Sequence, residues 1–505
     1  MLDNLDDIQL AGETTEYGAS NADQIKELAK ALTAPGSAAD LYTTPGGAIT
    51  MQSLEGMLVD LTLNQNDFTL WQDVNKIKAF STVEEYDQQI GHGISDGGFV
   101  DQMESPESQD VDIQKQIAIV KFMSEKWTVS DVAEATNRII DERTRQQRSA
   151  MIRILRNLSI AMYSGNSLWI PKSIDGLAAT IAGQSTSQVS DMRGATVSMA
   201  TFNLMGQLIT EGNGHVENSK IYVSPAGLQN LSTIIEAGAA NTGDRKIVEM
   251  GSNGVTIGGK ITGIMTAYGL MQPRMDKLLG LSFESKTVPQ YYSNVTATWV
   301  EGATSDKAPS MPSIALTNNA GPTSGSLWSA GTVRPSGVQY NYRVVARNAY
   351  GKSIASVAVL STSVIASGGS LSIVITPAQG DSGSKLPSCF EIYSEKVGGS
   401  GIYRYMDTIA AATNPLAAVT YVDINAYIPG TARMYIIDQT QAGEQRTMAF
   451  SQLLPIHNTD LAKVGRYSQG LINLYGTPKY YKPNVLVEIR NIGVTSSNVN
   501  LFNTI

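Results

Sequence analysis

Hydrophobic and polar residues alternate along two stretches that flank a polar, glycine-rich segment. Residues 79–86 (AFSTVEEY) have the composition of an extended strand, and residues 111–123 (VDIQKQIAIVKFM) alternate again. A two-residue spacing places side chains on one face of a strand. The pattern predicts a long β-hairpin whose second arm carries four apolar residues on one face: Val111, Ile113, Ile117 and Ile119.

The segment between the two arms, residues 91–110, has four glycines, one proline, five carboxylates and no Lys or Arg. A two-stranded hairpin is marginally stable alone in water, so we expect a partner to hold it. Three roles for the acidic tip stay open: a salt-bridge surface toward another subunit, a solvated tip, or calcium binding without EF-hand spacing. The carboxylates are Asp96, Asp101, Glu104, Glu107 and Asp110.

The next pattern has helical period. Apolar residues recur at i, i+3, i+4 and i+7 through residues 151–162, and we predict one long helix over 134–164. Its arginines either form a solvated surface or meet carboxylates of another subunit through charge-assisted bonds. We single out three of them as hypothetical inter-subunit partners of the acidic tip: Arg143, Arg145 and Arg148.

Short strand-like segments with turn signals between them follow from about residue 303 to 445, as in a β-sandwich. GVQYNYRVVARNAYGKS (residues 337–353) resembles the late-strand signature of fibronectin type III or immunoglobulin-like modules. In that reading four alternate residues face the core: Tyr340, Tyr342, Val344 and Ala346. The other expected strands are 353–360, 371–376, 389–395, 402–409, 420–423 and 433–438.

The regions on either side of this stretch mix helices and strands, so the expected fold class is α+β. Residues 219–235 (SKIYVSPAGLQNLSTII) predict a strand that ends at Pro225 and a helix that begins there, and residues 290–300 (QYYSNVTATWV) predict another strand. We therefore expect a sandwich, residues 303–445, inserted into a host domain that residues 446–505 complete. Insertion at a surface loop costs little because loop-closure entropy grows slowly with length.

Composition limits the function. Charged residues make up only 16% of the 505 residues, against the roughly 25% of ordinary soluble domains, so much of the surface is expected to lie in contacts. The net charge of −9 argues against tight nucleic-acid binding. Neither a signal peptide nor an 18-residue apolar run is apparent, so we expect no membrane association and synthesis in a cytoplasm.

No catalytic, cofactor or metal site is expected. Residues 93–97 (GISDG) match the form of a hydrolase nucleophile elbow, but the apolar strand that must precede the serine is absent. The lone Cys389 excludes an intrachain disulfide. Trp328 and the tyrosine-rich strands either bind a sugar or, as we favour, belong to a core.

The order of these parts resembles that of tailed-bacteriophage major capsid proteins of the Hong Kong 97 fold. The resemblance covers roughly residues 36–302 and 446–505 and rests on the order and proportions of the elements. It implies the following layout: an N-terminal arm (1–50), a first capsid-fold part (51–302) with an extended loop (72–128), a spine helix (134–164) and an axial domain (about 199–299), then the insertion (303–445) and a C-terminal return (446–505).

The resemblance also implies a function. A protein of this family is a structural subunit, not an enzyme, and assembles into pentamers and hexamers of an icosahedral head around double-stranded DNA. The implied partners are further copies of the chain, portal and scaffolding proteins, possible decoration or head-fibre proteins, and DNA through weak non-specific contact. The implied location is the virion, after synthesis in the host cytoplasm.

Two alternatives stay open at this point. One is a cell-surface adhesin or tail-fibre-like protein whose sandwich binds glycans. The other is an encapsulin-type compartment of the same fold, which carries enzyme cargo in place of DNA. Particles seen by electron microscopy would argue against the first alternative, and nuclease-protected DNA inside them would argue against the second.

Overall fold

The computed structural model describes most of the chain between residues 67 and 494. The described residues are 67–93, 99, 101–103, 105, 108, 110–136, 141–184, 188–231, 248–251, 254–257, 261, 263–293, 298–441, 443–463 and 465–494. The predicted N-terminal arm, residues 1–50, therefore lies outside the described residues.

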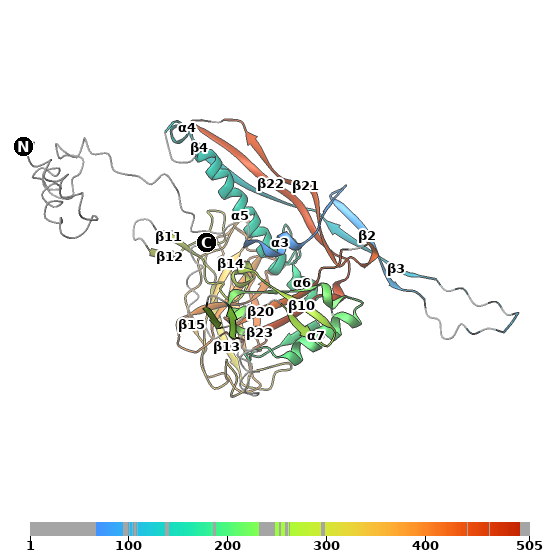
Figure 1. The fold of residues 1–505 in the computed structure, drawn as a ribbon. Helices are drawn as coiled ribbons and strands as arrows, with labels where there is room; N and C mark the ends of the chain where they lie inside the picture. Colours follow the sequence, from blue (N-terminus) through green and yellow to red (C-terminus); the bar gives the residue numbers. More distant parts are fainter. Residues whose placement is uncertain are drawn as a thin grey trace, which may run out of the picture. The chain divides into compact units, whose positions relative to one another are not determined.

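A four-stranded sheet brings together both ends of the described chain (Figure 1). Its order is β1 (Lys76–Lys78), β21 (Met448–Leu461), β22 (Tyr467–Tyr480) and β4 (Lys121–Ser130), with only β1 and β21 parallel. Helix α5 (Glu142–Ser164) packs on β4 and β22. Its apolar stripe is confirmed, because Ile154, Leu158 and Met162 are fully buried in the core beneath the helix.

The long helix begins later than the sequence predicts. Residues of the expected start form a separate short helix, α4 (Asp131–Ala135), which ends with Thr136 in an extended conformation. Helix α5 starts after Asp141, whose carboxylate accepts hydrogen bonds from the backbone N–H groups of Arg143 and Thr144. An Asp cap of this kind satisfies otherwise orphaned donors and fixes the helix start, so the prediction of residue 134 was wrong.

A six-stranded sheet forms a second layered unit. Its order is β5 (Val189–Asp191), β23 (Val487–Ile492), β20 (Ala432–Asp438), β6 (Ser219–Val223), β10 (Gly269–Met275) and β9 (Ile264–Thr266). Helix α7 (Met199–Glu211), capped by Ser198, buries Phe202, Met205 and Ile209 in the core of this sheet. The predicted strand before Pro225 and the helix from that residue are both confirmed.

Short elements connect these layers. The segment expected as one strand, residues 290–300, is instead a pair of antiparallel strands, β11 (Gln290–Ser293) and β12 (Thr298–Glu301). Strands β7 (Val248–Gly251) and β8 (Gly254–Ile257) form another pair. The short helices are α3 (Thr69–Asp73), α6 (Leu177–Ala182), α9 (Lys277–Ser282), η4 (Val216–Asn218), η5 (Gly383–Lys385), η6 (Gly443–Gln445) and η7 (Pro483–Val485).

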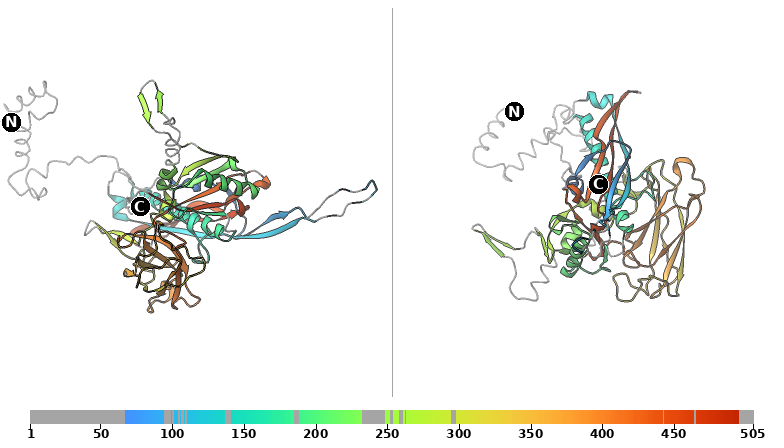
Figure 2. Two further views of the ribbon diagram at one scale, coloured as in Figure 1. Left: turned by 90° about the horizontal axis from the view of Figure 1, so that it is seen from below. Right: turned by 90° about the vertical axis from the view of Figure 1, so that its right-hand side faces the viewer.

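Residues 313–423 form two antiparallel sheets that share one core (Figure 2). One sheet has the order β13 (Ser313–Asn319), β16 (Ser370–Thr376), β19 (Val419–Asp423). The other has the order β15 (Val359–Leu360), β14 (Asn341–Arg347), β17 (Cys389–Glu395), β18 (Tyr403–Ala410). The four residues predicted to face the core do so, each no more than 1% exposed: Tyr340, Tyr342, Val344 and Ala346.

One strand expected in this sandwich belongs elsewhere. Strand β20, predicted as residues 433–438, pairs with β6 and β23 of the six-stranded sheet. Five consecutive residues, 434–438, are all buried, so the strand has no exposed face and no alternation to show which sheet it joins. The chain thus returns to the host sheet before β21.

Candidate assembly site: the hairpin, the spine helix and their charged contacts

Strands β2 (Val83–Gly91) and β3 (Asp112–Ile119) pair in antiparallel register and confirm the predicted hairpin (Figure 1). One face of this hairpin is fixed to the rest of the chain. Glu84 forms an ion pair with Lys479 and accepts a hydrogen bond from the Ser451 hydroxyl at 2.6 Å. Tyr86 packs edge-on against Tyr481, with ring centroids 5.1 Å apart. These contacts attach the base of the hairpin to the β21–β22 pair.

The opposite face of the hairpin is uncovered. Ile113 is 65% exposed, Ile117 60% and Ile119 53%. Val83, which pairs with Ile119, belongs to the same face by its alternation with Glu84. We call Val83, Val111, Ile113, Ile117 and Ile119 the outer strip. Because isolated exposed apolar residues are ordinary but an aligned set is not, the outer strip indicates a surface that a partner covers.

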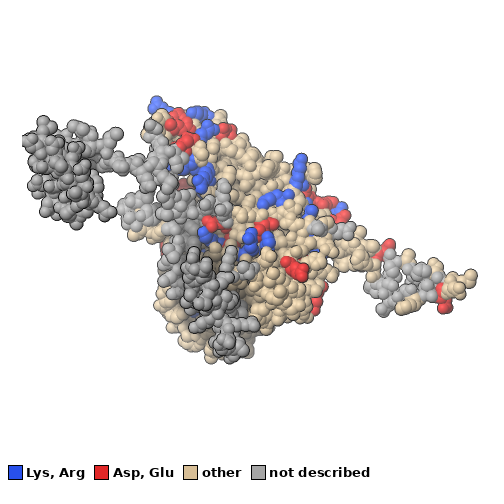
Figure 3. Space-filling model, in the orientation of Figure 1, with Lys and Arg blue, Asp and Glu red and all other residues tan. Residues whose placement is uncertain are grey.

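The acidic tip is only partly described. Asp101 and Asp110 are exposed, whereas Asp96, Glu104 and Glu107 lie outside the described residues. Figure 3 shows acidic and no basic side chains on the described part of the tip. The roles proposed for these carboxylates between subunits therefore stay predictions.

Two of the three arginines expected to meet the tip have carboxylate partners within the chain. Arg143 donates to Asp460 at 2.7 Å and lies over the Trp127 ring, 5.4 Å from its centroid. Arg145 pairs with Glu142 at 2.6 Å, one helical turn away. Arg148 is exposed, with no ion pair to any described residue. Since Arg143 and Arg145 remain 42% and 44% exposed, each can still reach a second carboxylate.

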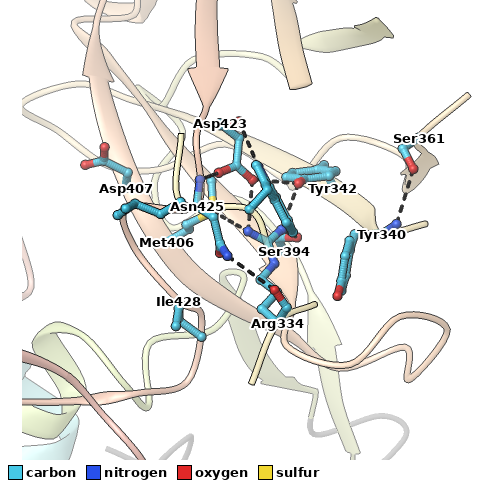
Figure 4. Close-up of polar contacts among 12 residues, drawn as sticks. Arg334, Tyr340, Tyr342, Ser361, Ser394, Met406, Asp407, Asp423, Asn425 and Ile428 are labelled. Carbon is cyan, nitrogen blue, oxygen red and sulfur yellow. Dashed lines mark hydrogen bonds and ion pairs between the residues drawn. The ribbon is translucent and has the colours of Figure 1, made fainter. Parts of the chain in front are cut away.

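A buried ionic network lies inside the sandwich and was not expected from the sequence. Arg334 pairs with Asp423 at 2.9 Å and also donates to Tyr342 and Ser394 (Figure 4). Burial alone would lower the pKa of Arg334, but Tyr342 and Asp423 together hold it above its ordinary value. Trp328 is 2% exposed and lies against the Arg334 guanidinium, so it is a core residue, as favoured above.

A second buried cluster joins the sandwich to the host. Glu391 of β17 pairs with Arg347 and Lys352 of the sandwich and with Lys286 of the host, each at 2.9–3.0 Å. Burial by itself would raise the pKa of Glu391, but the three cations hold it well below its usual range. One carboxylate thus fixes the 347–352 turn of the sandwich against the segment that follows α9. The sequence alone could not predict this junction, because Lys286 and Glu391 lie 105 positions apart along the chain.

No group of three or more His, Cys, Asp or Glu side chains able to hold a metal ion occurs among the residues described. Most of the GISDG motif lies outside them. No helix in the described part of the chain is long and apolar enough to cross a membrane.

Comparison with known proteins gives one relative that spans the chain. The "Putative major capsid protein" of Enterococcus phage phiEF24C is 21% identical over 471 residues, which covers 91% of this chain and 93% of that protein. No family model matches the sequence.

Solved structures with similar coordinates include several shells. The capsid of the native GTA particle covers 90% of this chain and 99% of its own, with 8% identity and a TM-score of 0.39. The capsid of Cyanophage P-SCSP1u gives the same coverage, 7% identity and a TM-score of 0.41. The encapsulin SrpI of Synechococcus elongatus PCC 7942 covers 87% of this chain and 94% of its own, with 8% identity and a TM-score of 0.36.

TM-scores in this range do not establish a shared fold by themselves. The sequence relative carries the conclusion, since the match extends over 91% of this chain and 93% of that protein. The resemblance to phage major capsid proteins that the order of elements predicted is thus confirmed.

Proposed function

We propose that this chain is the shell-forming subunit of a tailed-phage head. It assembles into rings of five and six that tile an icosahedral shell around double-stranded DNA, and it performs no catalysis. In such rings the contact between neighbours is heterologous, so each subunit contacts its two neighbours through two different surfaces. The hairpin forms one of these two surfaces, and its outer strip rests on the next subunit.

The observation that carries the proposal is the contrast between the two faces of the hairpin. The inner face has specific polar and aromatic anchors, so the hairpin is held in one orientation. The outer strip has none and stays more than half exposed at Ile113, Ile117 and Ile119. Covering side chains of this size contributes roughly 1 to 2 kcal/mol each, enough for three of them to favour association strongly.

The inserted sandwich fits a role on the outer surface of the shell. It has its own closed core and its own buried ion pair, so it needs no neighbour to be stable. We propose an immunoglobulin-like module that decorates the particle or meets a partner outside it. Portal and scaffolding proteins are further expected partners, and contact with packaged DNA is weak because the chain carries a net charge of −9.

Negative-stain electron microscopy of the purified chain tests the proposal. Closed shells, or rings of five and six subunits, are the expected result. Monomers at every concentration up to the millimolar range would contradict it. Nuclease-protected double-stranded DNA in particles from infected cells separates a phage head from an enzyme compartment, which would contain protein cargo instead.

A further inference from the structure

A cavity of about 750 Å³ opens where the host meets the inserted sandwich. Its walls come from the start of β4, the C-terminal half of α5, the loop that follows α5, the segment after α9, and the 347–352 turn of the sandwich. Such a volume is typical of a ligand site and far larger than one ion needs. Six basic residues line it: Lys121, Arg156, Lys172, Lys286, Arg347 and Lys352.

The charges around this cavity do not balance. Glu125 is the one carboxylate among its lining residues, and it also pairs with Arg153 outside the cavity. Glu391 lies behind the wall and is shared by three of the cations. Burial lowers the pKa of Lys286 to about 7, so this side chain is only partly charged at neutral pH. Even so, the basic residues of the lining outnumber the two carboxylates. Like charges held together away from water are costly unless an anion joins them.

Arg156 shows most directly that the cavity lacks hydrogen-bond acceptors for its basic residues. Its Nε atom is buried, with no hydrogen-bond partner among the described residues. Burial lowers the pKa of Arg156, and the neighbouring Arg153 pushes in the same direction against the attraction of Glu125. Lys172 is exposed at the mouth, where its ammonium lies 5.5 Å from the centroid of the Tyr350 ring. A guanidinium inside and an ammonium at the rim suit an extended chain of carboxylates.

We propose that this cavity receives a carboxylate-rich peptide, and that the peptide is the 91–110 tip of the hairpin of a second copy. This inference rests on the proposed shell function, and it identifies the surface of the neighbouring subunit that receives the hairpin tip, here called the receiving surface. The tip supplies five carboxylates and no cation, which complements the excess of basic residues in the cavity. A 20-residue tip folded back on itself extends up to about 30 Å beyond the paired strands, long enough to enter a neighbour.

The choice of cavity also follows from the arginines of α5. Arg143 and Arg145 already share carboxylates within the chain, whereas the cavity has too few. The insertion contributes two of the six cations, Arg347 and Lys352, so the complete receiving surface exists only in a chain that carries the sandwich.

A charge exchange tests the assignment on the full-length chain. Glu104→Lys with Glu107→Lys should lower the particle yield at least tenfold, and so should Lys172→Glu with Lys121→Glu. The four substitutions together should restore at least half of the wild-type yield. Recovery supports the pairing, whereas a combined variant no better than either parent overturns it.

Cysteine cross-linking keeps the test decisive should a variant assemble poorly. Glu104→Cys with Lys172→Cys should give disulfide-linked oligomers in oxidised particles, while Glu104→Cys with Lys385→Cys, on the exposed η5 turn of the sandwich, should not. Native Cys389 does not compete, because it is 1% exposed and burial raises the pKa of its thiol to about 12.

The outcomes separate the two proposals. Particles that form without the Glu104–Lys172 cross-link overturn the cavity assignment alone. A cross-link to position 172 from Asp7→Cys, and none from Glu104→Cys, overturns it in favour of the N-terminal segment. A wild-type chain that never assembles overturns both the cavity assignment and the shell.

Discussion

The sandwich and the hairpin are both built from antiparallel strands, but they differ in how far their side chains are buried and paired within the chain. In the sandwich, the apolar residues of both sheets meet in one core, and even the Arg334 guanidinium has its counterion inside. In the hairpin, one face is anchored to β21 and β22, and the other keeps its apolar residues in water. The sandwich is therefore complete in a single chain, whereas the hairpin leaves one face that the proposed assembly covers.

The two regions therefore have different roles in the stability of the subunit and in association. Burial inside the sandwich contributes to the stability of the subunit and nothing to association. The outer strip contributes little to the subunit and is available to association. Substitutions in the two regions should thus have separable effects, and the following experiments test whether they do.

The largest expected effect is in the sandwich. Asp423→Asn removes the counterion of a guanidinium that is fully buried, which should cost about 3 to 5 kcal/mol of unfolding free energy. Urea unfolding or calorimetry of the isolated subunit measures it. Asp460→Asn is the matched control, because it breaks an exposed Arg–Asp pair worth less than about 1 kcal/mol. Equal losses in the two variants would contradict a self-contained sandwich.

The next effect concerns association. Ile117→Ser with Ile113→Ser should remove roughly 2 to 4 kcal/mol of contact per subunit and so abolish particles, because both residues lie on the outer strip. The unfolding free energy of the monomer should change by less than about 0.5 kcal/mol. Gln114→Ser, on an exposed residue of the same strand with the opposite orientation, serves as the control. Unchanged particle yield by light scattering would remove the outer strip from the assembly surface.

A smaller effect is expected at the anchor of the hairpin. Burial alone would raise the pKa of Glu84, but hydrogen bonds from Lys479, Ser451 and the Phe80 backbone hold it below its ordinary value. A carboxyl with a lowered folded pKa stabilises above its unfolded pKa of about 4.3 and loses that contribution as pH falls. Amide exchange at the base of the hairpin, corrected for intrinsic rates, should therefore quicken below about pH 4.

Glu84→Gln provides the check on that interpretation. The variant should show the faster exchange at neutral pH and no further change on acidification, since the titrating group is gone. A variant that keeps the acid response would assign the response to another carboxylate.

The sequence predicted the elements whose pattern is periodic. The alternation of Ile113, Ile117 and Ile119 located the hairpin face, and the spacing of Ile154, Leu158 and Met162 located the buried side of α5. Tyr342 of β14 and Tyr340, just before this strand, were placed correctly in the core. Each of these depends on local geometry, which a strand or helix imposes on its own residues.

The sequence did not show the features that depend on contacts between residues far apart along the chain. Strand β20 has no exposed face, so its alternation could not distinguish the sandwich from the six-stranded sheet. The start of α5 depends on which carboxylate caps it, and several acidic or hydroxyl residues precede the helix. The Glu391 cluster and the basic cavity combine residues from four separate segments, and only the folded chain brings them together.

The most direct test of the central claim compares hydrogen exchange of residues 111–119 in isolated subunits and in assembled particles. The account predicts that these amides become protected at least tenfold on assembly, while the buried strands β14 and β17 of the sandwich keep the same protection in both states. Equal exchange of residues 111–119 in subunits and particles would contradict it.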